Sequence, residues 1–452
     1  MKKKYYLKVL TLVILSISTT VFSQTNKEIK EIQKSYNLEK LKNLAEYYRL
    51  ESKQNKEKAL KLAQQKGWPI SYIDQDGSFN ELVSVTADEK PIYNQTTNVN
   101  AARSTRANWL HNGGGLGLNV EGQGMTAHVW DAGLARSTHQ EYDGAGGDNR
   151  YSSGDGSTSL NFHGAHVTGT IISSGFDSGA KGMAPQAKGI GYDWNSDLSE
   201  VIDAASTGML LSNHSYVTSP DTVSDEDFGA YIGLSRSWDV AMYNAPYYLA
   251  VLASGNEGNS STLNGDPLEG NTLYDKINGR QTSKNSMIVA NAQDANIDPS
   301  SGNLNSVNIN SSSSQGPTDD LRIKPDITGN GTNVYSTYED FDSHYASISG
   351  TSMASPNVMG SLLLLQQYYN EVNGSFMRAA TLKGLALHTA DDAGSNGPDA
   401  VFGWGLMNSK KAAEAITNNG LQSLVSEEVL EEGETFTITV SCLLYTSPSP
   451  RD

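Results

Sequence analysis

The sequence predicts an α/β fold with a mostly parallel central sheet. From about residue 122 onward, short apolar runs alternate with segments of helical period. The apolar runs cover residues 125–130, 247–253 and 287–290, and the helical segments between them include 198–211 and 228–243. This alternation is typical of a sheet covered by helices on both faces, where ligands bind at the carboxyl ends of the strands. We therefore expect functional side chains directly after strands.

Residues 1–23 have the composition of a secretory signal peptide. Four lysines precede an apolar run over residues 9–17, and the small residue Ser23 ends the segment. The apolar run is shorter than the ~20 residues that a membrane span requires. The sequence thus predicts a secreted, extracellular protein without a membrane span.

Residues 24–102 differ in charge from the rest of the chain. They carry 12 basic and 11 acidic side chains, whereas residues 103–452 carry 17 basic and 39 acidic ones. The segment contains a predicted helical stretch over 28–66 and an alternating stretch over 79–85. Residues 91–106 are rich in Asn and Thr, a composition typical of an exposed linker that proteases cut easily. A nearly neutral segment tied by such a linker to an acidic body indicates a detachable partner.

The overall charge and the cysteine content exclude several classes of function. The net charge of −17, with 50 acidic against 33 basic side chains, argues against a nucleic-acid partner. The only cysteine is Cys442, so the sequence holds no internal disulfide and no metal site built from thiolates.

The C-terminal region predicts a second, incomplete domain. A helix is expected over 409–416, and the alternating residues 435–440 are typical of the first strand of a β domain. Residues 442–452 match the translation of a transposase sequencing adapter, so we expect the natural chain to continue differently and to lack Cys442. The predicted boundaries are 103–418 for the main domain and 419–441 for the start of a truncated β domain.

Three polar residues stand where strands end or helices begin. Asp131 follows an apolar strand, His163 opens a helix of small residues, and Ser352 precedes a strongly apolar helix. A serine hydroxyl becomes nucleophilic when a base takes its proton, and histidine is a better base when a buried carboxylate fixes its tautomer. These three residues together predict acyl-transfer chemistry.

Two hydrogen-bond donors are available for an oxyanion. The first amides of a helix lack intrahelical partners and lie at its positive end, so the backbone N–H of Ser352 can face a developing negative charge. Asn256 offers a side-chain amide on a glycine-flanked turn after the strand over 247–253.

The chain resembles the subtilisin-type serine proteases, the subtilases, from about residue 122 to 415. The segments around His163 (HGAHVTGT), Asn256 (ASGNEG) and Ser352 (GTSMASP) carry the resemblance, and the last is the most specific. The order Asp131, His163, Ser352 is also that of the subtilases, whereas other serine hydrolases use other orders.

The resemblance implies a three-layer subtilisin-like fold and a serine endopeptidase that needs no cofactor for catalysis. Asp131 would orient His163, His163 would activate Ser352, and Asn256 would hold the oxyanion. Polypeptides would be the substrates. Residues 24–102 would be a propeptide that assists folding, inhibits the enzyme and is removed by self-cleavage in the linker.

The resemblance also places substrate-binding residues and shows two departures. Ser215 and Tyr216 lie in the segment resembling the strand that pairs with substrate, and Gly255 lies in the segment before Asn256. Ala132 stands where subtilases usually have Ser or Thr, and Val217 stands where glycine is common. We expect a modest effect of Ala132, because backbone donors can support the carboxylate, and the shape of the specificity pocket stays open.

Metal binding has simpler alternatives in this sequence. His163 and His166 share a helix face at metal-ligand spacing, but a third ligand is not evident nearby, so we expect His166 to pack or hydrogen-bond inside the helix. The acidic, glycine-rich stretch over 143–156 suits a solvated loop. Structural calcium is common among the subtilases, so calcium stays an open alternative there.

Two other functions are compatible with the same residues. One is a catalytically silent subtilase scaffold that serves as a binding module, which would give no reason to keep all four site residues. The other is an esterase that uses the same nucleophile. Comparing the hydrolysis of a peptide anilide with that of an acyl ester separates these alternatives.

Overall fold

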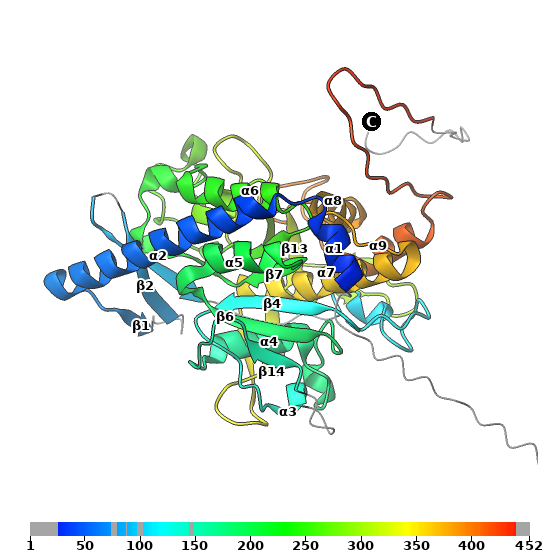
Figure 1. Ribbon diagram of the computed structural model, residues 1–452, viewed down its shortest axis with the longest axis horizontal. Coiled ribbons are helices and arrows are strands. Elements are labelled where there is room, and N and C mark those ends of the chain that lie inside the picture. Colours follow the sequence, from blue (N-terminus) through cyan, green and yellow to red (C-terminus); the bar gives the residue numbers. More distant parts are fainter. Residues whose placement is uncertain (1–25, 74–78, 87, 97–102, 144–148, 440–452) are drawn as a thin grey trace, which may run out of the picture.

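The centre of the molecule is a seven-stranded sheet. The computed structural model describes residues 26–73, 79–86, 88–96, 103–143 and 149–439 (Figure 1). The strand order is β13-β10-β9-β7-β4-β6-β5, and every pair in it is parallel. The strands are β4 (Thr126–Asp131), β5 (Tyr151–Ser153), β6 (Lys188–Asp193), β7 (Leu211–His214), β9 (Leu249–Ala253), β10 (Met287–Ala292) and β13 (Ile327–Asn330). The predicted α/β class with a mostly parallel sheet is confirmed.

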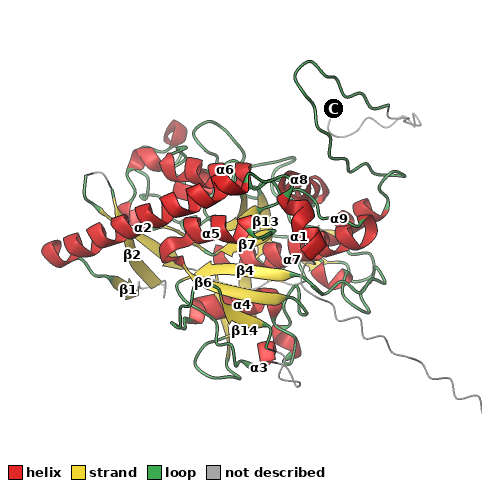
Figure 2. Cartoon of the chain, viewed as in Figure 1, coloured by secondary structure: helices red, strands yellow, loops and turns green. Residues whose placement is uncertain are grey.

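Helices lie on both sides of this sheet. Figure 2 shows α2, α5 and α6 above β4 and β6, and α4 below them. The helices of the main body are α3 (Gln140–Asp143), α4 (Phe162–Ile172), α5 (Asp197–Ser206), α6 (Gly233–Asn244), α7 (Thr351–Asn373), α8 (Ala379–Thr389) and α9 (Ser409–Thr417). The segments predicted as helical over 198–211 and 228–243 correspond to α5 and α6, and both helices are shorter than predicted. Leu211 begins β7 instead, because a buried apolar run of this length also suits a strand.

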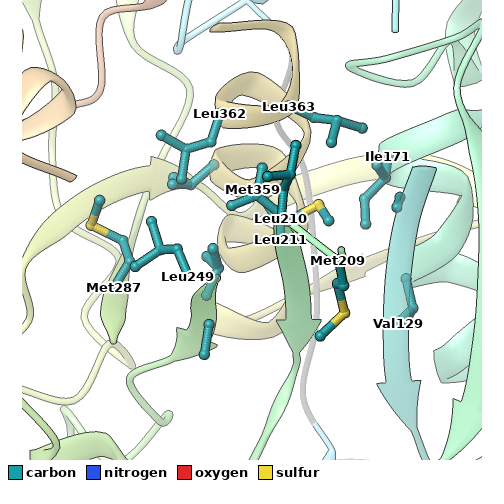
Figure 3. Packing of buried hydrophobic residues seen from close by; sticks show 14 of the residues in the cluster. Val129, Ile171, Met209, Leu210, Leu211, Leu249, Met287, Met359, Leu362 and Leu363 are labelled. Atoms are coloured by element: carbon teal, nitrogen blue, oxygen red, sulfur yellow. The ribbon is translucent and has the colours of Figure 1, made fainter. Parts of the chain in front are cut away.

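Helix α7 runs through the interior and carries much of the core. Leu362, Leu363, Leu364 and Leu365 are all fully buried, which explains why this helix is apolar on every side. Figure 3 shows Met359, Leu362 and Leu363 of α7 in one cluster with Leu211 of β7 and Leu249 of β9. The core therefore fixes the helix whose first turn contains Ser352.

Small antiparallel sheets complete the body. They contain β11 (Asn296–Ile297) with β12 (Leu304–Ser306), and β14 (Thr332–Thr337) with β15 (Tyr345–Ser349).

Among the described residues, no helix is both long and apolar enough to cross a bilayer. The region expected to begin a β domain has no regular element over 424–439, and residues 440–452, including Cys442, lie outside the described residues.

The N-terminal segment packs against the body as two helices and a small sheet. Its elements are α1 (Asn26–Gln33), α2 (Leu38–Lys66), β1 (Ser71–Ile73), β2 (Phe79–Val85) and β3 (Pro91–Thr96). The single predicted helical stretch is interrupted because Asn37 caps α2, its side chain accepting the N–H of Lys40. Ile32 and Tyr36 join the main hydrophobic core, and Arg49 forms an ion pair with Asp203 of α5.

The segment predicted as an exposed linker is ordered at both ends. Strand β3 pairs antiparallel with β2 and with β8 (Tyr216–Thr218) of the body. Ser104, Thr105 and Arg106 are buried, with Arg106 paired to Asp391. The prediction of an exposed segment was wrong at these two ends. Whether an Asn- and Thr-rich segment forms a strand depends on its context, and here β2 and β8 supply backbone partners for β3. Residues 97–102, between these ends, lie outside the described residues.

Candidate active site

The first pair of site residues is held where β4 ends and α4 begins. Asp131 is the last residue of β4, and His163 is the second residue of α4, whose N-cap Asn161 accepts the N–H of His163 at 2.8 Å. The Nδ1 atom of His163 lies 2.6 Å from Oδ1 of Asp131, and both side chains are buried. A proton on Nδ1 leaves Nε2 as the basic nitrogen. This is the tautomer that a general base for a serine requires.

The carboxylate of Asp131 is only partly satisfied. Its Oδ1 also accepts the backbone N–H of Ala132 at 2.8 Å, as expected for a backbone donor that replaces a missing hydroxyl. Its Oδ2 is buried and has no hydrogen-bond partner among the described residues. Ala132, which has no hydroxyl to donate, therefore lies next to a carboxylate oxygen without a hydrogen-bond partner among the described residues.

Ser352 lies in the first turn of α7 and contacts the end of β7. Its Oγ donates to the backbone oxygen of Ser215 at 2.8 Å. In the central sheet Trp130 of β4 pairs with His214 of β7, so Asp131 and Ser215 leave neighbouring strands side by side. The Asp131–His163 and Ser215–Ser352 pairs consequently meet at the carboxyl ends of β4 and β7. This is the edge of the sheet where the sequence predicts the site.

Asn256 presents an unpaired donor at the same edge. It follows β9, and its Oδ1 accepts the backbone N–H of Thr351 at 2.8 Å. An N–H can bond only to the amide oxygen, so this contact fixes the orientation of the side chain. The Nδ2 atom is buried without a hydrogen-bond partner among the described residues. A buried unpaired donor is costly, typically by about 1–3 kcal/mol, which is consistent with a donor that awaits an oxygen.

Tyr216 and Gly255, two of the residues predicted to bind substrate, differ in which of their groups a substrate could reach. Tyr216 lies in β8, and its side chain points inward, its hydroxyl donating to Asp197 at 2.9 Å. Only its backbone is available to a neighbouring strand, and there it pairs with Thr96 of β3. Gly255 has a φ of 110°, and an added Cβ would lie 2.8 Å from Oγ of Ser314. Glycine at this position keeps the turn before Asn256 tight.

His166 is packed in the interior, as expected, but its ring hydrogen-bonds to β14 and β15 rather than inside the helix. It is fully buried, and its Nε2 lies 3.1 Å from the oxygen of Ala346 and 3.3 Å from that of Val334. Burial lowers its pKa to about 3, so the ring is neutral at physiological pH. No group of three or more His, Cys, Asp or Glu side chains among the described residues is arranged to hold a metal ion.

The acidic stretch considered for calcium is only partly described, since residues 144–148 lie outside the described residues. Within the described part, Asp155 already accepts hydrogen bonds from Ser153, Ser157 and the backbone of Asp193. Its oxygens stabilise a turn. Calcium binding at this stretch stays a prediction.

The sequence did not single out the polar residues that support Ser352 from behind. Asn213 and Ser355 are both fully buried and hydrogen-bonded to each other at 2.8 Å. The available signal was the two-residue spacing of Asn213, in β7, and Ser215, directly after β7, because this spacing places both side chains on the same face of an extended chain.

Comparison with known proteins identifies the family of this chain. The profile described as the Subtilase family matches residues 83–405. The chain belongs to the subtilase family. This subtilase is 29% identical over 302 residues to Subtilisin BL of Lederbergia lenta, covering 65% of this chain and 92% of that protein. It is 28% identical over 352 residues to an alkaline protease of Alkalihalobacillus alcalophilus, covering 76% of this chain and 74% of that protein.

A solved structure described as the patellamide maturation protease PatA is also similar. It shares 20% identity with this subtilase at a TM-score of 0.48, covering 65% of this chain and 97% of that one. The resemblance seen in the three sequence segments is confirmed by the family match. The protein is a subtilisin-type serine peptidase with a subtilisin-like α/β fold.

Proposed function

We propose that this subtilase is a secreted endopeptidase that cleaves peptide bonds through an acyl-enzyme on Ser352. His163 takes the hydroxyl proton of Ser352 through Nε2, and the freed oxygen attacks the substrate carbonyl. Asp131 keeps the imidazole in the required tautomer and stabilises its charged form. In the second step His163 activates the water that hydrolyses the acyl-enzyme. The observation that carries the proposal is the buried 2.6 Å contact between His163 and Asp131 at the end of β4. It lies next to the end of β7, where the hydroxyl of Ser352 donates to the backbone oxygen of Ser215.

The oxyanion of each step would be held by two donors. These are the backbone N–H of Ser352 and Nδ2 of Asn256, which has no partner among the described residues. Because Oδ1 of Asn256 is already committed to Thr351, the amide needs no rearrangement to offer its N–H groups. Preorganised donors of this kind stabilise the transition state without a cost of reorientation.

The substrate would bind as an extended strand beside β8. Strand β3 already occupies this position, with Thr96 opposite Tyr216, Gln95 opposite Val217 and Asn94 opposite Thr218. The pairing is antiparallel and uses backbone groups, so it accepts many sequences. A peptide bound in this way would lead its scissile bond toward Ser352.

The same pairing supports a zymogen in which the N-terminal segment is an inhibitor. While β3 stays on β8, a substrate has no free strand edge to join. Residues 97–102, which follow β3, would be cut by the enzyme itself, and residues 1–23 would direct export beforehand. The docked helices α1 and α2 would keep the cleaved segment on the body until it is released or degraded.

Labelling with a phosphonylating reagent tests the nucleophile. The folded, matured protein should be labelled on Ser352, as located by mass spectrometry of its peptides. The Ser352→Ala protein should be neither labelled nor processed in the segment after β3. The proposal would be contradicted if the folded, matured protein were not labelled. It would also be contradicted if the Ser352→Ala chain still cleaved itself.

Asn256→Asp tests the oxyanion donor separately. Aspartate keeps an oxygen for the N–H of Thr351 but removes the Nδ2 donor. We expect turnover to fall about 10²- to 10³-fold with little change in KM, the range known for such a donor in a related subtilisin. An unchanged turnover would exclude Asn256 from this role. Parallel hydrolysis of a peptide anilide and an acyl ester measures how strongly the enzyme prefers amide over ester substrates.

A further inference from the structure

The carbonyl of Ser352 lacks its usual helical partner. In an α-helix the carbonyl of residue i accepts the N–H of residue i+4. Four residues after Ser352 stands Pro356, which has no N–H. Since Ser352 is fully buried, its carbonyl needs another donor.

Ser215 supplies that donor from the neighbouring strand end. Its hydroxyl donates to the oxygen of Ser352 at 2.5 Å, and its own backbone oxygen accepts the hydroxyl of Ser352 at 2.8 Å. The two serines are thus joined by a reciprocal pair of hydrogen bonds. Both ends of the nucleophilic residue, its backbone carbonyl and its hydroxyl, are held by the same residue.

Asn213 fixes the hydroxyl of Ser215 in turn. Its Nδ2 donates to Oγ of Ser215 at 2.9 Å, which leaves the serine proton directed at Ser352. Its Oδ1 accepts the hydroxyl of Ser355, the fifth residue of α7, at 2.8 Å. Four buried residues thus form a hydrogen-bond network that joins the end of β7 to the start of α7: Asn213, Ser215, Ser352 and Ser355.

We propose that Ser215 is a positioning residue for the nucleophile, in addition to any contact with substrate. This role rests on the proposed function of Ser352. The hydroxyl of Ser215 anchors the first turn of α7 to β7, so that the Ser352 side chain stays in line with the base and the oxyanion donors. A misplacement of about 1 Å at a reacting group costs on the order of 100-fold in rate, so a single anchoring bond matters here.

The primary test is Ser215→Ala, with second-order phosphonylation of Ser352 and steady-state peptide hydrolysis as readouts. We expect both the labelling rate and kcat to fall about 10- to 100-fold while KM changes little. Ser215→Thr keeps the hydroxyl and should recover much of the lost rate. Equal labelling rates for the wild-type and Ser215→Ala proteins would overturn the proposal. If the wild-type protein is not labelled at all, the proposed function fails instead.

A second variant separates positioning from mere hydrogen-bond satisfaction. Pro356→Ala, added to Ser215→Ala, restores an N–H for the carbonyl of Ser352 within the helix. We expect the double variant to recover the melting temperature lost by Ser215→Ala but not the labelling rate, because the new bond does not tie α7 to β7. Recovery of both quantities would show a purely structural role and overturn the proposal.

Ser361→Ala is the matched control. Ser361 is a buried serine of the same helix, and its hydroxyl donates to the carbonyl of Asn357 at 2.8 Å. It lies more than two turns beyond Ser352. Its loss should lower stability without changing the labelling rate. A comparable fall in labelling would mean that any weakening of α7 has this effect, and the proposal would be abandoned.

Discussion

Asp131 and Asn256 each keep one buried polar atom without a partner among the described residues. These are Oδ2 of the carboxylate and Nδ2 of the amide. Most buried polar groups in folded proteins are hydrogen-bonded, so exceptions at one sheet edge call for an explanation. For Asn256 a transition-state oxygen is the expected partner. For Asp131 the explanation lies in Ala132, which has no hydroxyl to offer.

Ala132→Ser should therefore stabilise the folded protein. A hydroxyl on the residue after Asp131 is placed to donate to the same carboxylate, and we expect the free energy of unfolding to rise by about 1 kcal/mol. Urea unfolding of full-length Ser352→Ala protein, with and without the change, measures this without self-digestion. Ala132→Val adds a side chain of similar size without a donor. An equal gain from valine would show that packing is responsible.

At the scale of elements, the strands and helices that carry the site were predictable because their patterns are local. Buried parallel strands appear as continuous apolar runs, and Asp131 and Asn256 follow two such runs. The pairing of β3 with β8 was not predictable, because it joins segments more than a hundred residues apart and uses backbone groups alone. The inward direction of Tyr216 was missed for a related reason, since its partner Asp197 belongs to another element.

One buried carboxylate illustrates how loops around α4 are fixed. Glu141 of α3 is fully buried and accepts five hydrogen bonds. The donors are the hydroxyls of Ser174 and Tyr345 and the backbone N–H groups of Gly175, Phe176 and Asp177. The carboxylate thereby holds the loop after α4 against β15.

Glu141→Gln should destabilise the protein although it barely changes the volume. The amide would turn an NH₂ group toward donors, leaving several of them unpaired, and we expect a loss of about 2–4 kcal/mol in the free energy of unfolding. Urea unfolding in the Ser352→Ala chain measures the loss. Glu39→Gln, at an exposed site in the first turn of α2, is the control and should change stability little. A comparably small effect at Glu141 would contradict this account of the loop.

At the scale of the whole molecule, the N-terminal segment and the body share one hydrophobic core. Leu41, Ala45 and Tyr48 of α2 pack into the cluster that surrounds α7, whereas Ala59 and Ala63 belong to a smaller cluster with Leu82. The sequence indicated a separable partner from its charge, but it could not show that the first half of α2 completes the core. The packing of α2 therefore had to come from the structure.

The buried histidines make the stability of the whole molecule depend on acid. Burial lowers the pKa of His166 to about 3, and burial with the charge of Arg280 lowers the pKa of His214 well below its usual value. In the unfolded chain both rings titrate near pH 6.5, so below this pH the unfolded state binds more protons than the folded state. Stability is therefore complete above about pH 6.5 and falls as the pH decreases toward 3.

Titration of the fully buried His166 ring should contribute about 3 kcal/mol to the loss between pH 7 and pH 4, because one pKa unit corresponds to about 1.4 kcal/mol, and His214 adds to the loss in the same direction. Urea unfolding of the Ser352→Ala chain across this range measures the slope. His166→Gln replaces the ring by a neutral donor that does not titrate, so it should lower stability most near pH 7, less as the pH falls, and thereby reduce the slope. If His166→Gln leaves the slope unchanged, titration of this ring does not control the acid sensitivity, and the carboxylates become its source.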